Sequence, residues 1–275
     1  MRTVKQIIKG MPATDGAGVE LTRVIGQPAL NMLDPFLLLD AFRSDKPEDY
    51  IAGFPPHPHR GFETVTYLLE GRMRHKDNAG HEGVIESGGI QWMTAARGIE
   101  HSEMPEQENG LLEGFQLWVN LPAEHKMDAP AYQEYSKEKI PVETRDNGSV
   151  IRVITGKTSQ GTRGPVEQPL TEPLYLDVTL PANQQFDEAL PKLHNAFVYV
   201  INGPIEIAGN SLSRDELAIL SEGESISIHA AADDVRFLLI AGKPLNEPVA
   251  RGGPFVMNTK DEIDQAFEDY RLGRF

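Results

Sequence analysis

The sequence is broken into short runs of branched and aromatic residues, and turn-forming residues end each run. Glycine (25) and proline (20) are spread over the whole length of 275 residues. Runs of this kind have the length of β-strands, and they leave little room for long helices. Many short strands separated by turns are typical of antiparallel sandwiches or barrels, so we expect an all-β protein. Examples of such runs are residues 64–69, 115–121, 150–154, 174–180, 197–201, 225–228 and 235–240.

The two halves of the sequence resemble each other. The run VTYLLEG at 65–71 has a counterpart in FVYVING at 197–203, and Ser-Gly-Gly at 87–89 has one in Ser-Glu-Gly at 221–223. At about 100–200 residues per domain, a chain of this length has roughly two domains. We therefore expect a duplicated β-barrel. The predicted organisation is a first domain over residues 1–136, a polar linker over 137–148, a second domain over 149–257 and a C-terminal helix over 258–275.

The C-terminal helix has the clearest helical pattern in the chain. Asn258 or Thr259 can cap it, and two acidic residues follow in its first turn. Its apolar residues recur at helical spacing on one face: Ile263, Ala266, Phe267 and Tyr270. A weaker pattern over residues 128–135 predicts a second short helix, although Pro130 lies inside it.

Charge and composition exclude several classes of function. The chain carries 26 basic and 41 acidic residues, a net charge of −15, which repels a nucleic-acid backbone. It has no cysteine, so disulfides, zinc fingers and cysteine nucleophiles are excluded. There is no phosphate-binding loop and no nucleophile elbow. With no signal sequence and no long apolar stretch, we expect a cytoplasmic protein, and the acidity together with the lack of a heptad repeat favours a monomer.

Two short motifs indicate a metal site. His57 and His59 flank a proline, which favours an extended chain in which both side chains point to the same side. His101 and Glu103 repeat this spacing. If the two segments are neighbouring strands, three imidazoles and a carboxylate converge, a set that suits a divalent first-row metal. Glu63 is an alternative oxygen ligand, because it has the same strand parity as both histidines.

The other histidines are weaker candidates. His75 and His81 lie in a polar turn, where we expect them to be solvated, and we expect His125 to be exposed. When the second half is aligned on the repeat, residues that cannot bind a metal replace the candidate ligands: Ala189, Pro191, Val235 and Phe237. We therefore predict no metal site in the second domain.

Four segments resemble the pirin family of the cupin superfamily. They are GFPPHPHRGFETVTYLLEG at 53–71, QWMTAARGIEHSEMP at 91–105, LWVNLP at 117–122 and GPFVMNT at 253–259. The resemblance covers nearly the whole chain. It implies a bicupin, with two antiparallel β-barrels (double-stranded β-helices) face to face and the short C-terminal helix packed back on the N-terminal half. It also implies that Fe(II) is held only in the first barrel, by His57, His59, His101 and Glu103, which disfavours Glu63 as a ligand.

The resemblance implies two kinds of function. One is a metal-dependent quercetin or flavonol 2,3-dioxygenase that opens the ring with O2 and releases carbon monoxide. Glu103 would then also act as the base, and Phe54, Met73 and Gln116 would line the substrate pocket. The alternative is a redox-sensitive iron-binding regulator that acts through protein partners, as a transcriptional co-regulator or on metabolic enzymes, without turnover. By ligand type alone, manganese, nickel, cobalt, copper or zinc would also suit the site.

Overall fold

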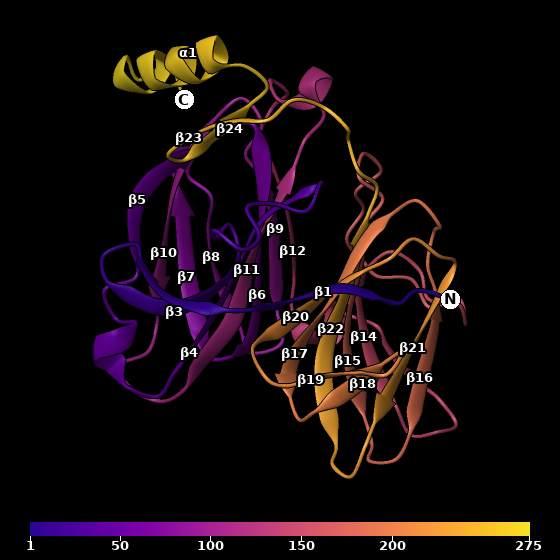
Figure 1. The fold of residues 1–275 in the computed structure, drawn as a ribbon. Coiled ribbons are helices and arrows are strands. Elements are labelled where there is room, and N and C mark those ends of the chain that lie inside the picture. The colour runs from indigo at the N-terminus through magenta and orange to yellow at the C-terminus, as the bar shows by residue number, and fades with distance from the viewer. The chain divides into compact units, whose positions relative to one another are not determined.

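The computed structural model describes residues 1–275, and it confirms an all-β protein with one α-helix. The chain forms two compact units, which are each assembled from separate stretches of sequence (Figure 1). We call residues 12–23, 36–137 and 245–275 the histidine unit, and residues 1–11, 24–35 and 138–244 the apolar unit.

The histidine unit contains two main sheets. The larger has seven strands in the order β12 (Ala131–Tyr135), β9 (Ile90–Thr94), β6 (Phe62–Glu70), β11 (Leu112–Asn120), β4 (Phe36–Ser44), β3 (Val19–Ile25) and β2 (Met11–Asp15). The smaller has the order β5 (Phe54–His59), β10 (Ile99–Pro105), β7 (Arg72–Asp77) and β8 (Glu82–Glu86). A two-stranded sheet pairs β23 (Ala250–Gly252) with β24 (Phe255–Met257), and two short 3₁₀ helices, η1 (Pro47–Asp49) and η2 (Ala123–His125), lie in loops.

The apolar unit repeats this arrangement. Its larger sheet has the order β1 (Val4–Lys9), β20 (Glu216–Leu220), β17 (Asn195–Asn202), β22 (Val235–Gly242), β15 (Leu174–Leu180), β14 (Val150–Thr155) and β13 (Val142–Thr144). Its smaller sheet has the order β16 (Gln185–Ala189), β21 (Ser225–Ala230), β18 (Ile205–Ile207) and β19 (Asn210–Leu212). The runs at 65–71 and 197–203 lie on β6 and β17, which hold the same place in the two larger sheets. The turns at 87–89 and 221–223 are not equivalent, because the first follows β8 and the second follows β20.

Two segments have pairing partners that sequence order does not suggest. The N-terminal strand β1 pairs with β20, with Val4 opposite Leu220, so residues 1–11 belong to the apolar unit. The polar stretch 137–148 begins with the 3₁₀ helix η3 (Lys137–Lys139) and also contains β13, which forms the edge of a sheet. Backbone pairing over long sequence separations determines both assignments, whereas composition indicated only a polar linker.

The interior of the apolar unit is filled with hydrophobic side chains. Phe186 of β16 and Ile226 and Ile228 of β21 are fully buried in its core cluster. By strand order, β16 and β21 are the counterparts of β5 and β10, which carry the candidate ligands. The alignment that placed Val235 and Phe237 at these positions was wrong. Both lie on β22, the counterpart of β11, because the turn at 87–89 precedes β9 whereas the turn at 221–223 follows β20, the counterpart of β9.

One predicted helix is confirmed and the other is wrong. Helix α1 (Lys260–Arg271) begins after Thr259, whose hydroxyl accepts a hydrogen bond from the Glu262 backbone in a capping box. Residues 131–135 instead form the strand β12, which pairs with β9. Pro130 disfavours a helix there, and the pairing supplies the backbone hydrogen bonds.

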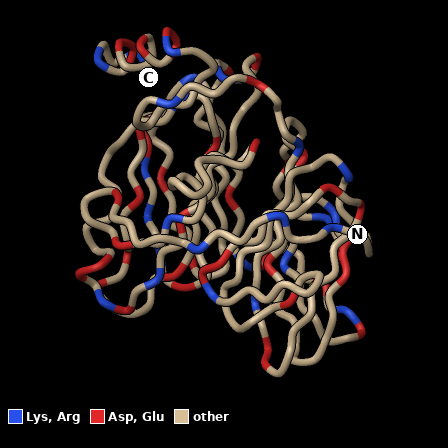
Figure 2. Tube along the Cα trace, in the orientation of Figure 1, with Lys and Arg blue, Asp and Glu red and all other residues tan.

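Charged residues are interspersed along the chain, and α1 carries both signs (Figure 2). Its first turn is acidic and its last turn contains Arg271. These charges stabilise the helix, because each has the sign opposite to that of the dipole at its end. No helix in the structure is long and apolar enough to cross a membrane.

Candidate metal centre

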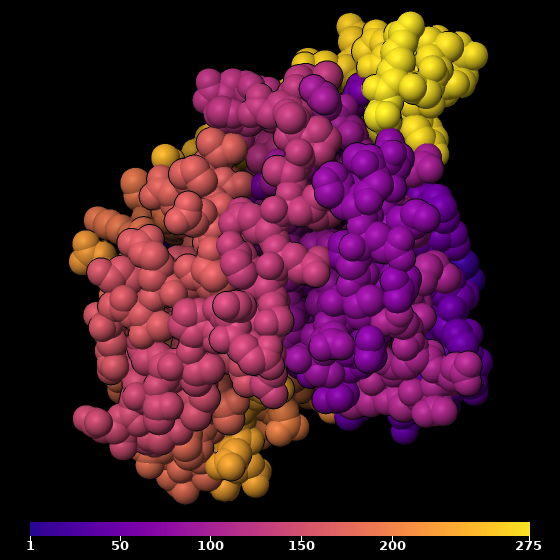
Figure 3. Space-filling view, turned by 180° about the vertical axis from the view of Figure 1, so that it is seen from behind, coloured from indigo at the N-terminus to yellow at the C-terminus, as the bar shows by residue number.

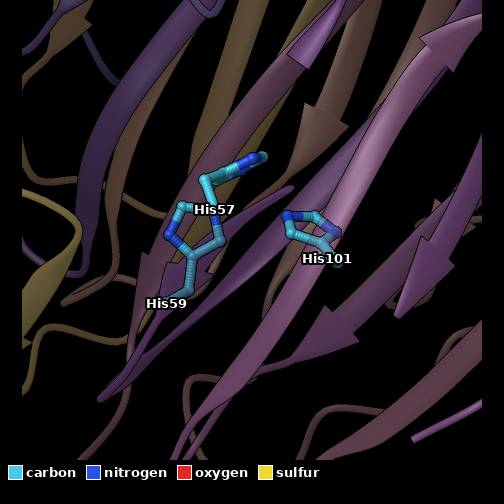
Figure 4. Close-up of side chains that lie close together, drawn as sticks. All are labelled: His57, His59 and His101. Carbon is cyan, nitrogen blue, oxygen red and sulfur yellow. The ribbon is translucent and has the colours of Figure 1, made fainter. Parts of the chain in front are cut away.

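Strands β5 and β10 bring three histidines together. They pair antiparallel, with His101 opposite His57 and Ile99 opposite His59. The ring centroid of His57 lies 4.7 Å from that of His59 and 4.6 Å from that of His101. The centroids of His59 and His101 are 5.1 Å apart. One ligand atom from each ring lies within 4.8 Å of the others, so the rings surround a common point (Figure 4).

Several of these nitrogens have no protein partner. Nδ1 of His57 lies 2.8 Å from the Pro55 carbonyl oxygen, and Nδ1 of His59 lies 3.4 Å from the Pro254 carbonyl oxygen. Nε2 of His59 and both ring nitrogens of His101 are buried without a hydrogen bond. Buried polar atoms are nearly always paired, and ligating histidines commonly direct their second nitrogen to a carbonyl. The residues present therefore fit a divalent metal ion.

Two of the three histidines, His59 and His101, are held in the neutral state that binds metals. Burial lowers the pKa of His59 well below its ordinary value, and the neighbouring His101 and His57 add to this effect. Burial also lowers the pKa of His101 to about 4. Both imidazoles are consequently neutral near pH 7, and a metal ion does not have to displace a proton from them.

Glu103, two residues after His101 on β10, is not part of the group that the three histidines form, and two other side chains hold it in place. Thr66 Oγ1 donates to Oε1 of Glu103 at 2.7 Å, and Gln116 Nε2 donates to Oε2 at 2.9 Å. Burial alone would raise the pKa of Glu103, but His101 and these two hydrogen bonds outweigh burial and lower the pKa. An ionised carboxylate close to the neutral imidazole of His101 favours the binding of a cation.

Glu63, the alternative oxygen ligand, is not at this site. It is fully buried, and its Oε1 accepts a hydrogen bond from Thr94 Oγ1 at 2.7 Å. Glu63 does not share a strand with His57 and His59, because the chain turns at Gly61, whose φ is +91°. His59 ends β5 in the smaller sheet, whereas Glu63 lies on β6 in the larger sheet.

The three expected pocket residues occupy two different environments. Gln116 holds Glu103, as described above. Met73 is buried in a hydrophobic cluster with Leu68 and Leu112, and Phe54 packs against the same cluster. Phe54 is also opposite Glu103 in the pairing of β5 with β10.

Sequence reasoning missed the aromatic wall of the site. The His59 ring centroid lies 5.1 Å from that of Phe62 and 5.2 Å from that of Trp118. The Phe62 and Trp118 centroids are in turn 4.4 Å apart. These residues come from β6 and β11, which are neighbours in the larger sheet. Their strand runs were visible in the sequence, but the approach of that sheet to β5 was not.

His75 is buried, contrary to its expected solvation. It lies on β7 opposite Glu103 of β10, and its Nε2 is 2.6 Å from a carboxylate oxygen of Glu134. Gly83 makes room for the ring, because a Cβ there would lie 2.5 Å from that nitrogen. The His81 side chain is 63% exposed and contacts Asp77, and His125 contacts Asp128 at 2.7 Å.

Two double-sheet units in one chain, with histidines gathered in one unit and hydrophobic side chains in the other, define a bicupin. The chain matches the family model described as Pirin over residues 18–119 and that of the Pirin C-terminal cupin domain over residues 175–275. It belongs to the pirin family.

Similar proteins come from distant organisms. A "Pirin-like protein" of Caulobacter vibrioides is 53% identical over 275 residues, which is 100% of this chain and 99% of the relative. Human "Pirin" is 45% identical over 265 residues, which is 94% of this chain and 88% of the human protein. A crystal structure titled quercetin 2,3-dioxygenase from Acinetobacter baumannii matches with a TM-score of 0.92 and 36% identity, covering 100% of this chain and 98% of that one.

Proposed function

We propose that the protein is a metal-dependent flavonol 2,3-dioxygenase whose metal is Fe(II). His57, His59, His101 and Glu103 would hold the ion. The observation that carries the proposal is the convergence of three imidazoles whose buried nitrogens lack protein partners. The likeness to the quercetin 2,3-dioxygenase of Acinetobacter baumannii supports the choice of substrate class.

The residues of the site suit an acidic aromatic alcohol. A bound Fe(II) would supply Lewis acidity and electron exchange with O2. The carboxylate of Glu103 would accept the proton of the flavonol 3-hydroxyl, while Gln116 and Thr66 keep the carboxylate oriented. The low pKa of Glu103 means that it is ready to accept a proton at neutral pH, but that it is a weak base. Transfer therefore requires a substrate hydroxyl whose own pKa is lowered in the site.

The overall reaction consumes one O2 and opens the central ring of the flavonol. Two oxygen atoms enter the product, and one ring carbon leaves as carbon monoxide. Trp118, which is partly exposed, lies beside His59, and the fully buried Phe62 packs against both rings. Aromatic walls of this kind bind flat aromatic substrates by offset or edge-on contacts and keep water away.

The test is turnover after anaerobic reconstitution with Fe(II). Quercetin and then O2 are added, and substrate loss and carbon monoxide release are followed together. We expect both in the wild type, and neither in the double variant His57→Ala/His101→Ala. The matched control is His81→Ala, because His81 is an exposed histidine of the same unit. Iron retention without carbon monoxide release would contradict the dioxygenase and favour the regulatory alternative.

A further inference from the structure

Arg60 is a buried cation that the proposed chemistry does not use. It follows the candidate ligand His59 directly, and its side chain is only 4% exposed. Its Nη1 donates to Oδ2 of Asp269 at 2.8 Å, and its Nε donates to the backbone carbonyl of Arg97. Its guanidinium carbon also lies 4.3 Å from the centroid of the Phe275 ring. A buried guanidinium with these partners is fixed on three sides.

Two of these partners come from the C-terminal segment, over residues 254–275. Asp269 lies on α1, and Phe275 follows that helix. Figure 3 shows α1 in yellow on the surface of the histidine unit, against purple residues of the same unit. Asp269 also accepts hydrogen bonds from Gln265 and Arg274, so the carboxylate is held in place from its own segment.

The same segment contacts both strands that carry candidate ligands. At the end of β5, the Pro254 carbonyl lies 3.4 Å from Nδ1 of His59, and the Val256 amide donates to the carbonyl of Arg60, the residue after the strand, at 3.0 Å. On β10, the Tyr270 hydroxyl donates to Glu100 at 2.6 Å, one residue before His101.

The contacts leave little room for adjustment around the histidines. A Cβ at Gly61 would collide with the Val256 carbonyl, and one at Gly98 would lie 2.9 Å from the Phe275 ring. Arg60 and His59 share a peptide bond, so the backbone that the contacts of Arg60 anchor also carries the candidate ligand. The Arg97 carbonyl connects the same guanidinium to the turn that precedes β10.

We propose that Arg60, held by Asp269 and Phe275, is a positioning residue for the metal centre, so that the C-terminal segment determines metal affinity without contributing a ligand. This inference rests on the proposed metal site. Groups that orient ligands typically change metal affinity by about 10- to 100-fold when they are removed.

The test uses Co(II) alone as the probe, added to metal-free full-length protein, with calorimetry for affinity and visible absorption for ligand geometry. We expect Asp269→Asn to weaken Co(II) binding on the order of tenfold and to shift the absorption bands. Asp269→Glu should restore part of the affinity. Glu268→Gln is the matched control, because Glu268 lies on the same helix but pairs only with the exposed Arg271.

A second variant guards against misfolding. Phe275→Leu leaves the Arg60–Asp269 pair in place and removes the ring over the guanidinium together with its contacts with Phe255 and Tyr270. We expect a loss of Co(II) affinity of about threefold. Affinity and spectrum equal to those of Glu268→Gln in both variants would overturn the proposal while leaving the metal site standing. A wild type that binds no Co(II), or binding that His57→Ala does not weaken, would overturn the metal site and this proposal together.

Discussion

His101 lies directly opposite His57 in the pairing of β10 with β5, and their ring centroids are 4.6 Å apart. The register of one strand pair therefore sets the distance between two candidate ligands. His59 completes the group because it is two residues from His57 on the same strand. The geometry of the centre depends on a small sheet, and the surrounding side chains decide its charge.

Removing one histidine should abolish tight metal binding. We expect His59→Ala and His101→Ala each to weaken Fe(II) or Co(II) binding by about 100-fold or more, since each removes a ligand rather than a group that orients one. Calorimetry on metal-free protein gives the affinities. His125→Ala is the control, because His125 lies in the loop helix η2 and contacts Asp128 instead. Equal losses in the control would argue against the site.

Acid should destabilise the metal-free protein through His101. Its folded-state pKa of about 4 lies below the ordinary 6.5, so the unfolded state binds more protons between these values. Stability is therefore present above about pH 6.5 and falls as the pH drops toward 4. Across this pH range, the free energy of unfolding should fall by about 3 kcal/mol. Urea unfolding of metal-free wild type and His101→Gln across this range should show a smaller pH dependence in the variant. Parallel pH profiles would contradict the expectation.

Two threonines allow a matched test of which glutamate serves the site. Thr66 donates to Glu103 and Thr94 donates to Glu63, each at 2.7 Å. We expect Thr66→Val to reduce turnover about tenfold, because a misplaced carboxylate loses the benefit of orientation. Thr94→Val should leave turnover nearly unchanged. The measurement is kcat with quercetin after Fe(II) loading. A larger loss of kcat in Thr94→Val than in Thr66→Val would indicate that Glu63, and not Glu103, serves the site.

Lys126 should make stability rise with pH. Burial lowers its pKa to about 8, and its Nζ donates to the Gly61 carbonyl and to Asn120 Oδ1, each at 2.6 Å. Between about pH 8 and 10.5 the unfolded state holds more protons than the folded state, so stability increases across that window.

Lys126→Met tests this expectation. We expect a loss of about 2 kcal/mol near pH 7, because buried carbonyls lose their donor. The difference in unfolding free energy between wild type and variant should grow from pH 8 to 10. A constant difference would show that Lys126 does not titrate in this range.

Local sequence pattern predicted the elements whose structure depends on near neighbours. The spacing of His57 and His59 around Pro58 predicted an extended strand, and Thr259 with Ile263 and Ala266 predicted the C-terminal helix. In both cases the determining interactions lie within a few residues. The ligand roles of the histidines and Glu103, and the expected pocket residues, remain predictions.

The errors arose where distant pairing decides the outcome. His75 is buried because β7 pairs with β10, and residues 131–135 form a strand because they pair with β9. Glu63 lies away from the site because the chain turns at Gly61 and continues in a different sheet. None of these pairings has a signature in the local run of residues, so periodicity alone could not find them.

The most direct measurement is iron-edge anomalous diffraction from crystals of the Fe(II)-loaded protein, with metal content determined on the same sample. We predict one iron per chain, located between the imidazoles of His57, His59 and His101, and no iron in His57→Ala/His101→Ala. Iron bound equally by the double variant, or an anomalous peak away from these three rings, would contradict this prediction.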